Sequence, residues 1–236
     1  MERTGPAPLD RAAAEEGPLE KVKFYFDPAC PWCYQTARWA RRLEELGEIE
    51  LSWGVFSLEV VNLSADKDPR ALEARSGPAL RTALVLRDRD GDKAVGTFYA
   101  SLGRRMWEEP PPPDDMAEAV RAALSASGLD PHTADRALAD PSTWDAVLEE
   151  HRALVDGTRS FGVPTIVLDD GAGLAMFGPV VSHLPTDEDA VALWRHTSWL
   201  VRYGNFAELK RSRLGRPDLP TVKWRAEQAA KADSPR

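Results

Sequence analysis

The feature that most constrains this chain is its pair of cysteines, Cys30 and Cys33, the only two among 236 residues. Apolar side chains alternate through residues 22–26, as in a buried β-strand that ends at an Asp-Pro pair. Residues 34–46 then have the pattern of a helix. The sequence Cys-Pro-Trp-Cys is therefore expected at a strand-to-helix turn, with its first cysteine at the start of the helix.

This position predicts redox chemistry. The unpaired N–H groups and the dipole at a helix N-terminus stabilise a thiolate, so Cys30 is the expected nucleophile. A second thiol one helical turn away can attack the mixed disulfide that forms and release the bound group. We assign that resolving role to Cys33.

Other interpretations of the two cysteines carry less weight. A disulfide that closes so short a loop restrains little chain entropy and would stabilise the fold only slightly. Zinc needs about four ligands, and a Cys-x-x-Cys supplies two. The histidines do not pair at metal-binding spacing; they are His132, His151, His183 and His196. We therefore expect no metal site.

Composition limits the partners and the compartment. The net charge of −8 argues against general binding to nucleic acid or to an anionic membrane. We see no secretory leader and no apolar run of the roughly 18 residues that a membrane span requires. The expected location is the cytoplasm, where a Cys-x-x-Cys is more often catalytic than structural.

The order of elements predicts the fold. After the first strand and helix, the pattern predicts a strand at 49–56 and an extended segment at 56–62. Helices follow across 69–157, with a break at 110–113. The chain then returns to strands at 163–168 and 174–177, joined by a turn at 169–173, and ends its pattern in a final helix at 187–203. This order is typical of an α/β, thioredoxin-like sheet with an inserted helical subdomain.

Domain boundaries follow from this order. The thioredoxin-like domain is expected to consist of residues 20–65 and 158–213, and the inserted helical subdomain of residues 66–157. The terminal segments 1–19 and 214–236 are expected to be flexible, because they are polar and rich in Ala, Glu, Gly or Pro.

A second wall of the site is expected at Val163, Pro164 and Thr165. Proline lacks an N–H and is usually excluded from strand interiors, so Pro164 should stand at the head of a strand. A cis bond there would turn the preceding backbone toward the dithiol. Val163 would then offer its backbone groups to a substrate lying across Cys30. The alternative is that Pro164 only starts the strand.

The chain resembles the DsbA-like branch of the thioredoxin superfamily, and within it the actinobacterial mycothiol-dependent nitroreductase group. The matching stretches together reach across most of residues 20–213. They are Phe26–Cys33, Phe56–Leu58 continuing to Asn62, Leu102–Arg105, Gly162–Thr165, Phe177–Val180 and Phe206–Arg211. The group's tryptophan and asparagine fall on Trp32 and Asn62. Its lid tyrosine has no counterpart at 67–77, and Tyr99 is the only tyrosine in the inserted block.

The resemblance implies a dithiol enzyme with no bound cofactor, reduced by a low-molecular-weight thiol, mycothiol. It would reduce disulfides or electrophilic, nitro-bearing small molecules. Pro31 and Trp32 are expected to shape the redox turn and contact substrate, and Trp32 either stacks on an aromatic substrate or shields the dithiol. Asn62 either binds a ligand or closes a turn. The sequence is compatible with a homodimer and does not fix the oligomeric state.

Two competing functions stay open. One is a kappa-class-like isomerase or glutathione-conjugating enzyme, in which a serine usually stands at the first redox position; Cys30 argues against it. The other is a non-catalytic thioredoxin-fold binding module, which the intact cysteine pair weakens. Arg104 and Arg105 either hold a carboxylate-bearing thiol or lie on a solvated helix face. Three basic residues near the C-terminal end are expected on the surface: Lys210, Arg211 and Arg213.

Overall fold

The computed structural model describes residues 19–168, 174–213 and 215–232. Its described part contains a four-stranded sheet in the order β2-β1-β3-β4. The strands are β1 (Glu20–Phe26), β2 (Ile49–Val55), β3 (Thr165–Leu168) and β4 (Ala175–Phe177). The pair β1·β2 is parallel, and the pairs β1·β3 and β3·β4 are antiparallel. Because β1 and β3 are neighbours, the segments that precede β3 and follow β1 are brought together.

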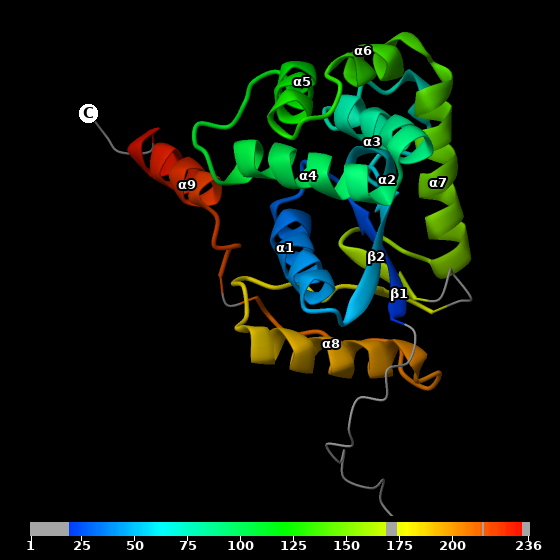
Figure 1. Ribbon diagram of the computed structural model, residues 1–236, viewed down its shortest axis with the longest axis vertical. Coiled ribbons are helices and arrows are strands. Elements are labelled where there is room, and N and C mark those ends of the chain that lie inside the picture. Colours follow the sequence, from blue (N-terminus) through cyan, green and yellow to red (C-terminus); the bar gives the residue numbers. More distant parts are fainter. Residues whose placement is uncertain (1–18, 169–173, 214, 233–236) are drawn as a thin grey trace, which may run out of the picture.

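Two helices pack on each other beside the sheet. Helix α1 (Pro31–Glu45) connects β1 to β2, and α8 (Asp187–Arg202) follows the last strand (Figure 1). The indole N–H of Trp39 on α1 donates to the carbonyl of Ala190 on α8 at 3.2 Å. Arg42 also donates two hydrogen bonds to the carboxylate of Asp187, at 2.8 and 2.6 Å. A buried indole hydrogen bond and a forked ion pair thus fix α8 against α1.

A block of helices lies between β2 and β3 in the sequence and forms the upper and right-hand part of the molecule in Figure 1. These elements are α2 (Leu58–Val61), the 3₁₀ helix η1 (Pro69–Ala71), α3 (Gly77–Asp90), α4 (Asp92–Trp107), α5 (Met116–Ala126), α6 (His132–Ala139) and α7 (Ser142–Thr158). The expected helical insertion is confirmed, and the break at 110–113 separates α4 from α5.

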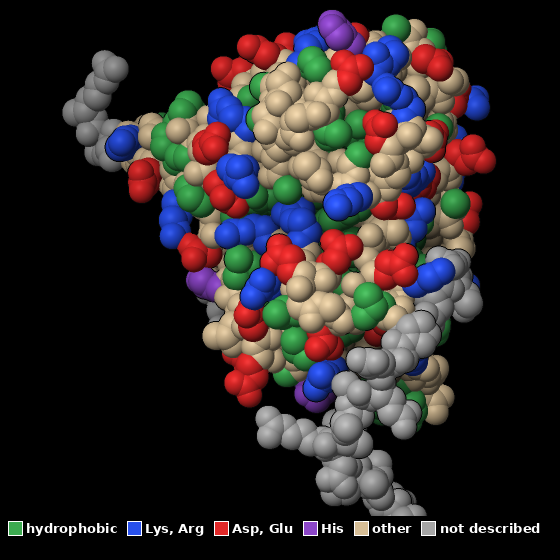
Figure 2. Space-filling model, in the orientation of Figure 1, with side chains coloured by type: hydrophobic (Ala, Val, Ile, Leu, Met, Phe, Trp, Pro, Cys, Tyr) green, Lys and Arg blue, Asp and Glu red, His purple; other side chains and the backbone are tan. Residues whose placement is uncertain are grey.

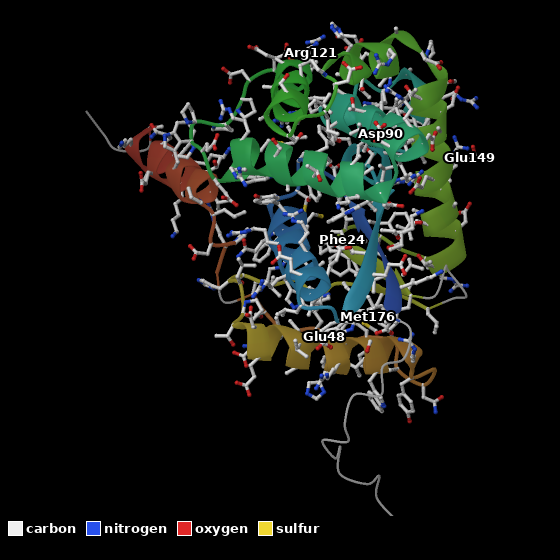
Figure 3. The ribbon with its side chains drawn as sticks, in the orientation of Figure 1. Phe24, Glu48, Asp90, Arg121, Glu149 and Met176 are labelled. Atoms are coloured by element: carbon white, nitrogen blue, oxygen red, sulfur yellow. The ribbon has the colours of Figure 1, made fainter. Side chains whose placement is uncertain are left out.

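An aromatic cluster joins the inserted helices to the sheet. Tyr99 of α4 stacks on Phe26 of β1, with ring centroids 4.0 Å apart. Trp53 of β2 meets the rings of Tyr99, Phe26 and Phe24 edge-on. Phe24 is seen in the interior of the molecule in Figure 3. Such pairs stabilise a core beyond their buried area, so the insertion and the sheet share one core.

Helix α4 also approaches α1 closely at Gly103. A Cβ built at this position would lie 2.1 Å from the Cε2 atom of Tyr34. Only a residue without a side chain therefore lets the Tyr34 ring pack against the α4 backbone.

A partly buried ion-pair network ties the block to the sheet as well. Arg87 of α3 donates to both carboxylate oxygens of Glu150 on α7, at 3.0 and 2.6 Å. Glu150 accepts the N–H of Val55 at 3.1 Å, and the Nζ atom of Lys23 lies 3.3 Å from it. The forked geometry and the additional donors satisfy a carboxylate that is 13% exposed.

Two expectations about the chain outside the sheet are wrong. Residues 58–61 form helix α2 rather than an extended segment, because the Ser57 hydroxyl accepts the N–H of Val60 and caps a helix.

The segment after residue 214 is not wholly flexible, since Pro220–Ala232 forms helix α9 and α8 is not the final helix. Leu219 is fully buried, and Arg225 lies over the Trp107 ring at 5.3 Å, so α9 is attached to α4.

Some expectations concern residues outside the described part. Residues 1–18 and the turn at 169–173 belong to this group. Within the described residues, none of the helices is long and apolar enough to cross a bilayer.

Candidate active site

The dithiol lies where β1 passes into α1. Cys30 is the N-cap residue of α1, with extended backbone angles of −94° and 111°, and Pro31 occupies the first turn. Proline suits that position because its missing N–H would have no partner there. The backbone N–H of Cys33 donates to the Cys30 Sγ at 3.3 Å. The first cysteine thus lies at a helix N-terminus, and both thiols are free.

The two thiols have opposite acidities. The pKa of Cys30 is lowered, first because the Cys33 thiol donates a hydrogen bond to it and further by the backbone N–H groups of Cys33 and Trp32. The pKa of Cys33 is raised well above its ordinary value, first by burial and then by that same hydrogen bond. Cys33 is fully buried, while Cys30 is 6% exposed. The Cys30 thiol therefore ionises first and is the more accessible of the two.

The backbone before β3 lies against the Cys30 sulfur. The Cys30 Sγ is 3.9 Å from the carbonyl oxygen of Val163, and the Val163–Pro164 bond is cis. The two groups are 133 residues apart in the sequence and meet because β3 pairs with β1. The structure thus brings together the two segments that the sequence singled out.

The Thr165 side chain points into this loop. Its hydroxyl donates to the carbonyl of Gly162 at 2.7 Å and lies 2.8 Å from the Ser160 hydroxyl. The Thr165 residue is 1% exposed. The carbonyl of Pro164 accepts the N–H of Gly178 at 2.8 Å, which joins the loop to the end of β4. These contacts hold the loop backbone in place beside Cys30.

Trp32 is half-buried at the turn. The Arg213 guanidinium lies over its ring, 4.6 Å from the ring centroid. This is a favourable cation–π geometry. Arg213, expected on a solvated surface, therefore covers one face of the tryptophan while it remains exposed itself.

Asn62 lies at the end of α2. Its side-chain amide donates to the carbonyl of Leu58 at 2.6 Å, and the residue is exposed. This hydrogen bond satisfies a carbonyl at a helix C-terminus. The contact corresponds to the turn-closing alternative.

Asp27 acts electrostatically on both thiols, and sequence reasoning did not single it out. It is fully buried, and its carboxylate accepts the N–H groups of Ala29 and Leu58 at 2.8 Å each and the Ser76 hydroxyl at 3.2 Å. Burial raises its pKa to about 6, although these hydrogen bonds lower it. Its charge raises the pKa of both thiols. The sequence signal was an Asp-Pro pair just before the cysteines, which indicated only the end of a strand.

The histidines do not form a metal centre. His151 is buried, its Nδ1 accepts the N–H of Ser57 at 3.3 Å, and burial lowers its pKa to about 4. Across the part of the chain that the structure describes, no group of three or more His, Cys, Asp or Glu side chains is arranged to hold a metal ion.

Comparison with solved structures identifies the fold. The chain is similar to a probable DsbA oxidoreductase, SCO1869, from Streptomyces coelicolor, with a TM-score of 0.52 and 19% identity over 83% of this chain and 94% of that one. It is also similar to the cytosolic disulfide reductase DsbM from Pseudomonas aeruginosa, with a TM-score of 0.54 and 17% identity over 76% of this chain and 99% of that one. The fold is thus thioredoxin-like with a helical insertion, as expected.

Comparison of sequences identifies the family. The chain is 34% identical to the uncharacterized protein Rv2286c of Mycobacterium tuberculosis over 194 residues, which are 82% of each chain. Residues 29–211 match the profile of the Rv2466c-like family, described by its member, the mycothiol-dependent nitroreductase Rv2466c. This match includes both cysteines and the loop before β3. The chain therefore belongs to the Rv2466c-like family of mycothiol-dependent nitroreductases and is an oxidoreductase.

Proposed function

We propose that this protein is a cytoplasmic, mycothiol-linked thiol-disulfide oxidoreductase that reduces disulfides or electrophilic, nitro-bearing small molecules. The observation that carries the proposal is the contrast between the two thiols at the start of α1. Cys30 has a lowered pKa and some exposure, whereas Cys33 is fully buried with a raised pKa. This is the asymmetry that a nucleophile and a resolving thiol require.

The reaction with a disulfide proceeds in two exchanges. The Cys30 thiolate attacks one sulfur of the substrate, a mixed disulfide forms, and the other half leaves as a thiolate. Cys33 then loses its proton and attacks the Cys30 sulfur, which forms the Cys30–Cys33 disulfide and releases the second half. Two electrons have passed to the substrate. Two mycothiol molecules restore the dithiol by the reverse exchanges and leave as mycothiol disulfide.

The surrounding residues serve these steps in different ways. Val163 presents its carbonyl at the sulfur that reacts, so we assign its backbone, with Pro164, to the substrate-contacting wall. Pro31 and Trp32 form the rim of the turn, and we assign the exposed part of the half-buried indole, beside Arg213, to substrate contact. Thr165 orders the loop through Gly162 rather than contacting substrate, since its side chain is buried.

Asp27 is assigned as the proton acceptor for the buried thiol. With a pKa raised to about 6, it is largely ionised at neutral pH, and its charge acts on Cys33. Cys33 must give up a proton before it can resolve the mixed disulfide, and a buried base near it is the group that can receive that proton. A ligand-binding role for Asn62 stays a proposal beside the turn-closing contact that its amide makes with Leu58.

The test compares reductants. The oxidised protein is incubated with mycothiol, glutathione or reduced thioredoxin, and free thiols are counted with a chromogenic disulfide over time. We expect mycothiol to restore two thiols per chain fastest and Cys30→Ser to abolish turnover of a disulfide or nitro substrate. Reduction by thioredoxin alone, with mycothiol inert, would overturn the proposed reductant. Glutathione conjugation by Cys30→Ser would favour the kappa-class alternative instead.

A further inference from the structure

A cleft lies between α1, α4 and the start of α8. It has a volume of about 570 Å³, and four arginines line it: Arg38, Arg41, Arg42 and Arg104. Figure 2 shows basic side chains gathered in a band between the positions of α4 and α1. Arg41 follows Cys30 by eleven residues, so at about 1.5 Å of rise per residue the two lie roughly 16 Å apart along α1. We call this hollow the arginine cleft.

The carboxylates of the cleft are already engaged. Asp187 and Glu45 both accept hydrogen bonds from Arg42, the closest of them at 2.6 and 2.7 Å. The third carboxylate, Glu108, accepts the Tyr34 hydroxyl at 2.7 Å, and the Nε atom of Arg38 lies 3.5 Å from it. All three acidic side chains that line the cleft thus already have a hydrogen-bond or ion-pair partner, which is Arg42, Tyr34 or Arg38.

The other two arginines have no carboxylate partner within ion-pair distance among the described residues. The guanidinium of Arg41 lies between three aromatic rings, 5.7 Å from the centroids of Tyr34 and Tyr99 and 5.8 Å from that of Trp53. Its Nη1 atom is shielded from solvent and has no hydrogen-bond partner. Arg104 is exposed on α4 and borders the same cleft.

A shielded guanidinium N–H without a hydrogen-bond partner, as at the Arg41 Nη1 atom, favours the binding of an anion. The rings offset part of the cost of removing the guanidinium from water, but they accept no N–H hydrogen bond of ordinary strength. A buried cation without a partner is expensive, and proteins normally pair it. The planar donor fork of arginine matches the oxygens of a carboxylate or a phosphate. The apolar side chains of Leu184 and Pro185 on the same wall would suit an organic body beside that group.

We propose that the arginine cleft binds a small organic anion through a carboxylate or phosphate group, with Arg41 and Arg104 as its ligands. The site is separate from the dithiol and does not depend on the proposed redox function. Among the described residues, neither arginine forms a hydrogen bond or ion pair with the two cysteines or with the loop before β3. Arg104 lies on the opposite wall from Arg41, so the anion bridges α4 and α1 through charge-assisted hydrogen bonds.

The test is calorimetric titration of the full-length reduced protein with inorganic phosphate and with citrate, against chloride at matched ionic strength. We expect saturable binding of one anion per chain, and the stronger of the two probes identifies phosphate or carboxylate as the preferred group. Arg41→Met and Arg104→Gln should each weaken binding at least tenfold. The matched control is Arg121→Gln on α5, an exposed arginine paired with Asp135, which should bind like the wild type.

Thermal unfolding without ligand checks the fold of each variant. Arg41→Met removes a partly buried guanidinium whose shielded Nη1 atom has no partner, so it should unfold no earlier than the wild type. Arg104→Gln changes an exposed side chain and keeps the test valid even if Arg41→Met proves unstable. If neither anion binds more tightly than chloride, or if Arg104→Gln binds as well as the wild type, the proposal is overturned.

Discussion

The hydrogen bond from the Cys33 thiol to the Cys30 sulfur should govern how much Cys30 thiolate exists near neutral pH. This bond is the largest cause of the lowered Cys30 pKa. A hydrogen bond to a charged group contributes about 1.5–3 kcal/mol. At about 1.4 kcal/mol per factor of ten, Cys33→Ala should lower the thiolate fraction of Cys30 about ten- to a hundredfold.

The assay is the initial rate of alkylation by iodoacetamide at pH 6, where thiolate supply limits the rate. Cys33→Ser is the matched control, because its hydroxyl can still donate to the Cys30 sulfur while it cannot form a disulfide. We expect Cys33→Ala to react at least tenfold more slowly than Cys33→Ser. Equal rates for the two variants would refute the reasoning, since the backbone N–H groups alone would then hold the thiolate.

Three further predictions concern the buried groups around the site. Burial raises the pKa of Asp27 from 3.8 to about 6. The protonated carboxyl therefore stabilises the fold at low pH by about 3 kcal/mol, and this stabilisation is lost as the pH rises through about 6. In chemical denaturation from pH 4 to pH 7, Asp27→Asn should therefore gain about that much stability relative to the wild type, and parallel profiles would contradict the assignment. Gly103→Ala places a Cβ 2.1 Å from the Tyr34 ring and should lower the unfolding free energy by about 1–3 kcal/mol in the same assay. The control Gly157→Ala on α7, whose Cβ would meet nothing within 4 Å, should leave the unfolding free energy unchanged or raise it. Tyr99→Phe removes a buried hydroxyl that has no partner and should leave the unfolding free energy unchanged or higher, while Tyr34→Phe loses a 2.7 Å hydrogen bond to Glu108 and should lower it.

The sequence predicted the part of the site that local chemistry controls. The alternating strand before Cys30 and the proline after it are enough to place a thiol at a helix N-terminus. The meeting of Cys30 with Val163 was also predictable, because a β-α-β order with a long helical insertion returns the later strand to the first one. The residue-level match to a known family supported both expectations.

What could not be predicted depends on contacts between distant residues. The buried state of Asp27 exists only because Leu58 and Ser76 donate to its carboxylate, and neither residue is marked by a pattern of its own. The sequence analysis did not single out Arg41, because nothing in its helical pattern shows that rings of β2 and α4 lie against its guanidinium. Helix α9 was missed because its sequence is polar and few of its contacts are apolar: the buried Leu219 and Thr221 lie at its start, and Arg225 lies over the Trp107 ring.

The central claim, that Cys30 attacks and Cys33 resolves, is tested most directly by mapping a trapped mixed disulfide. Cys33→Ser and Cys30→Ser are each mixed with one equivalent of mycothiol disulfide, quenched with acid, digested and examined by mass spectrometry. We predict a mycothiol adduct on Cys30 that accumulates in Cys33→Ser, and almost none on Cys33 in Cys30→Ser. An adduct that forms on Cys33 as fast as on Cys30 would contradict the account.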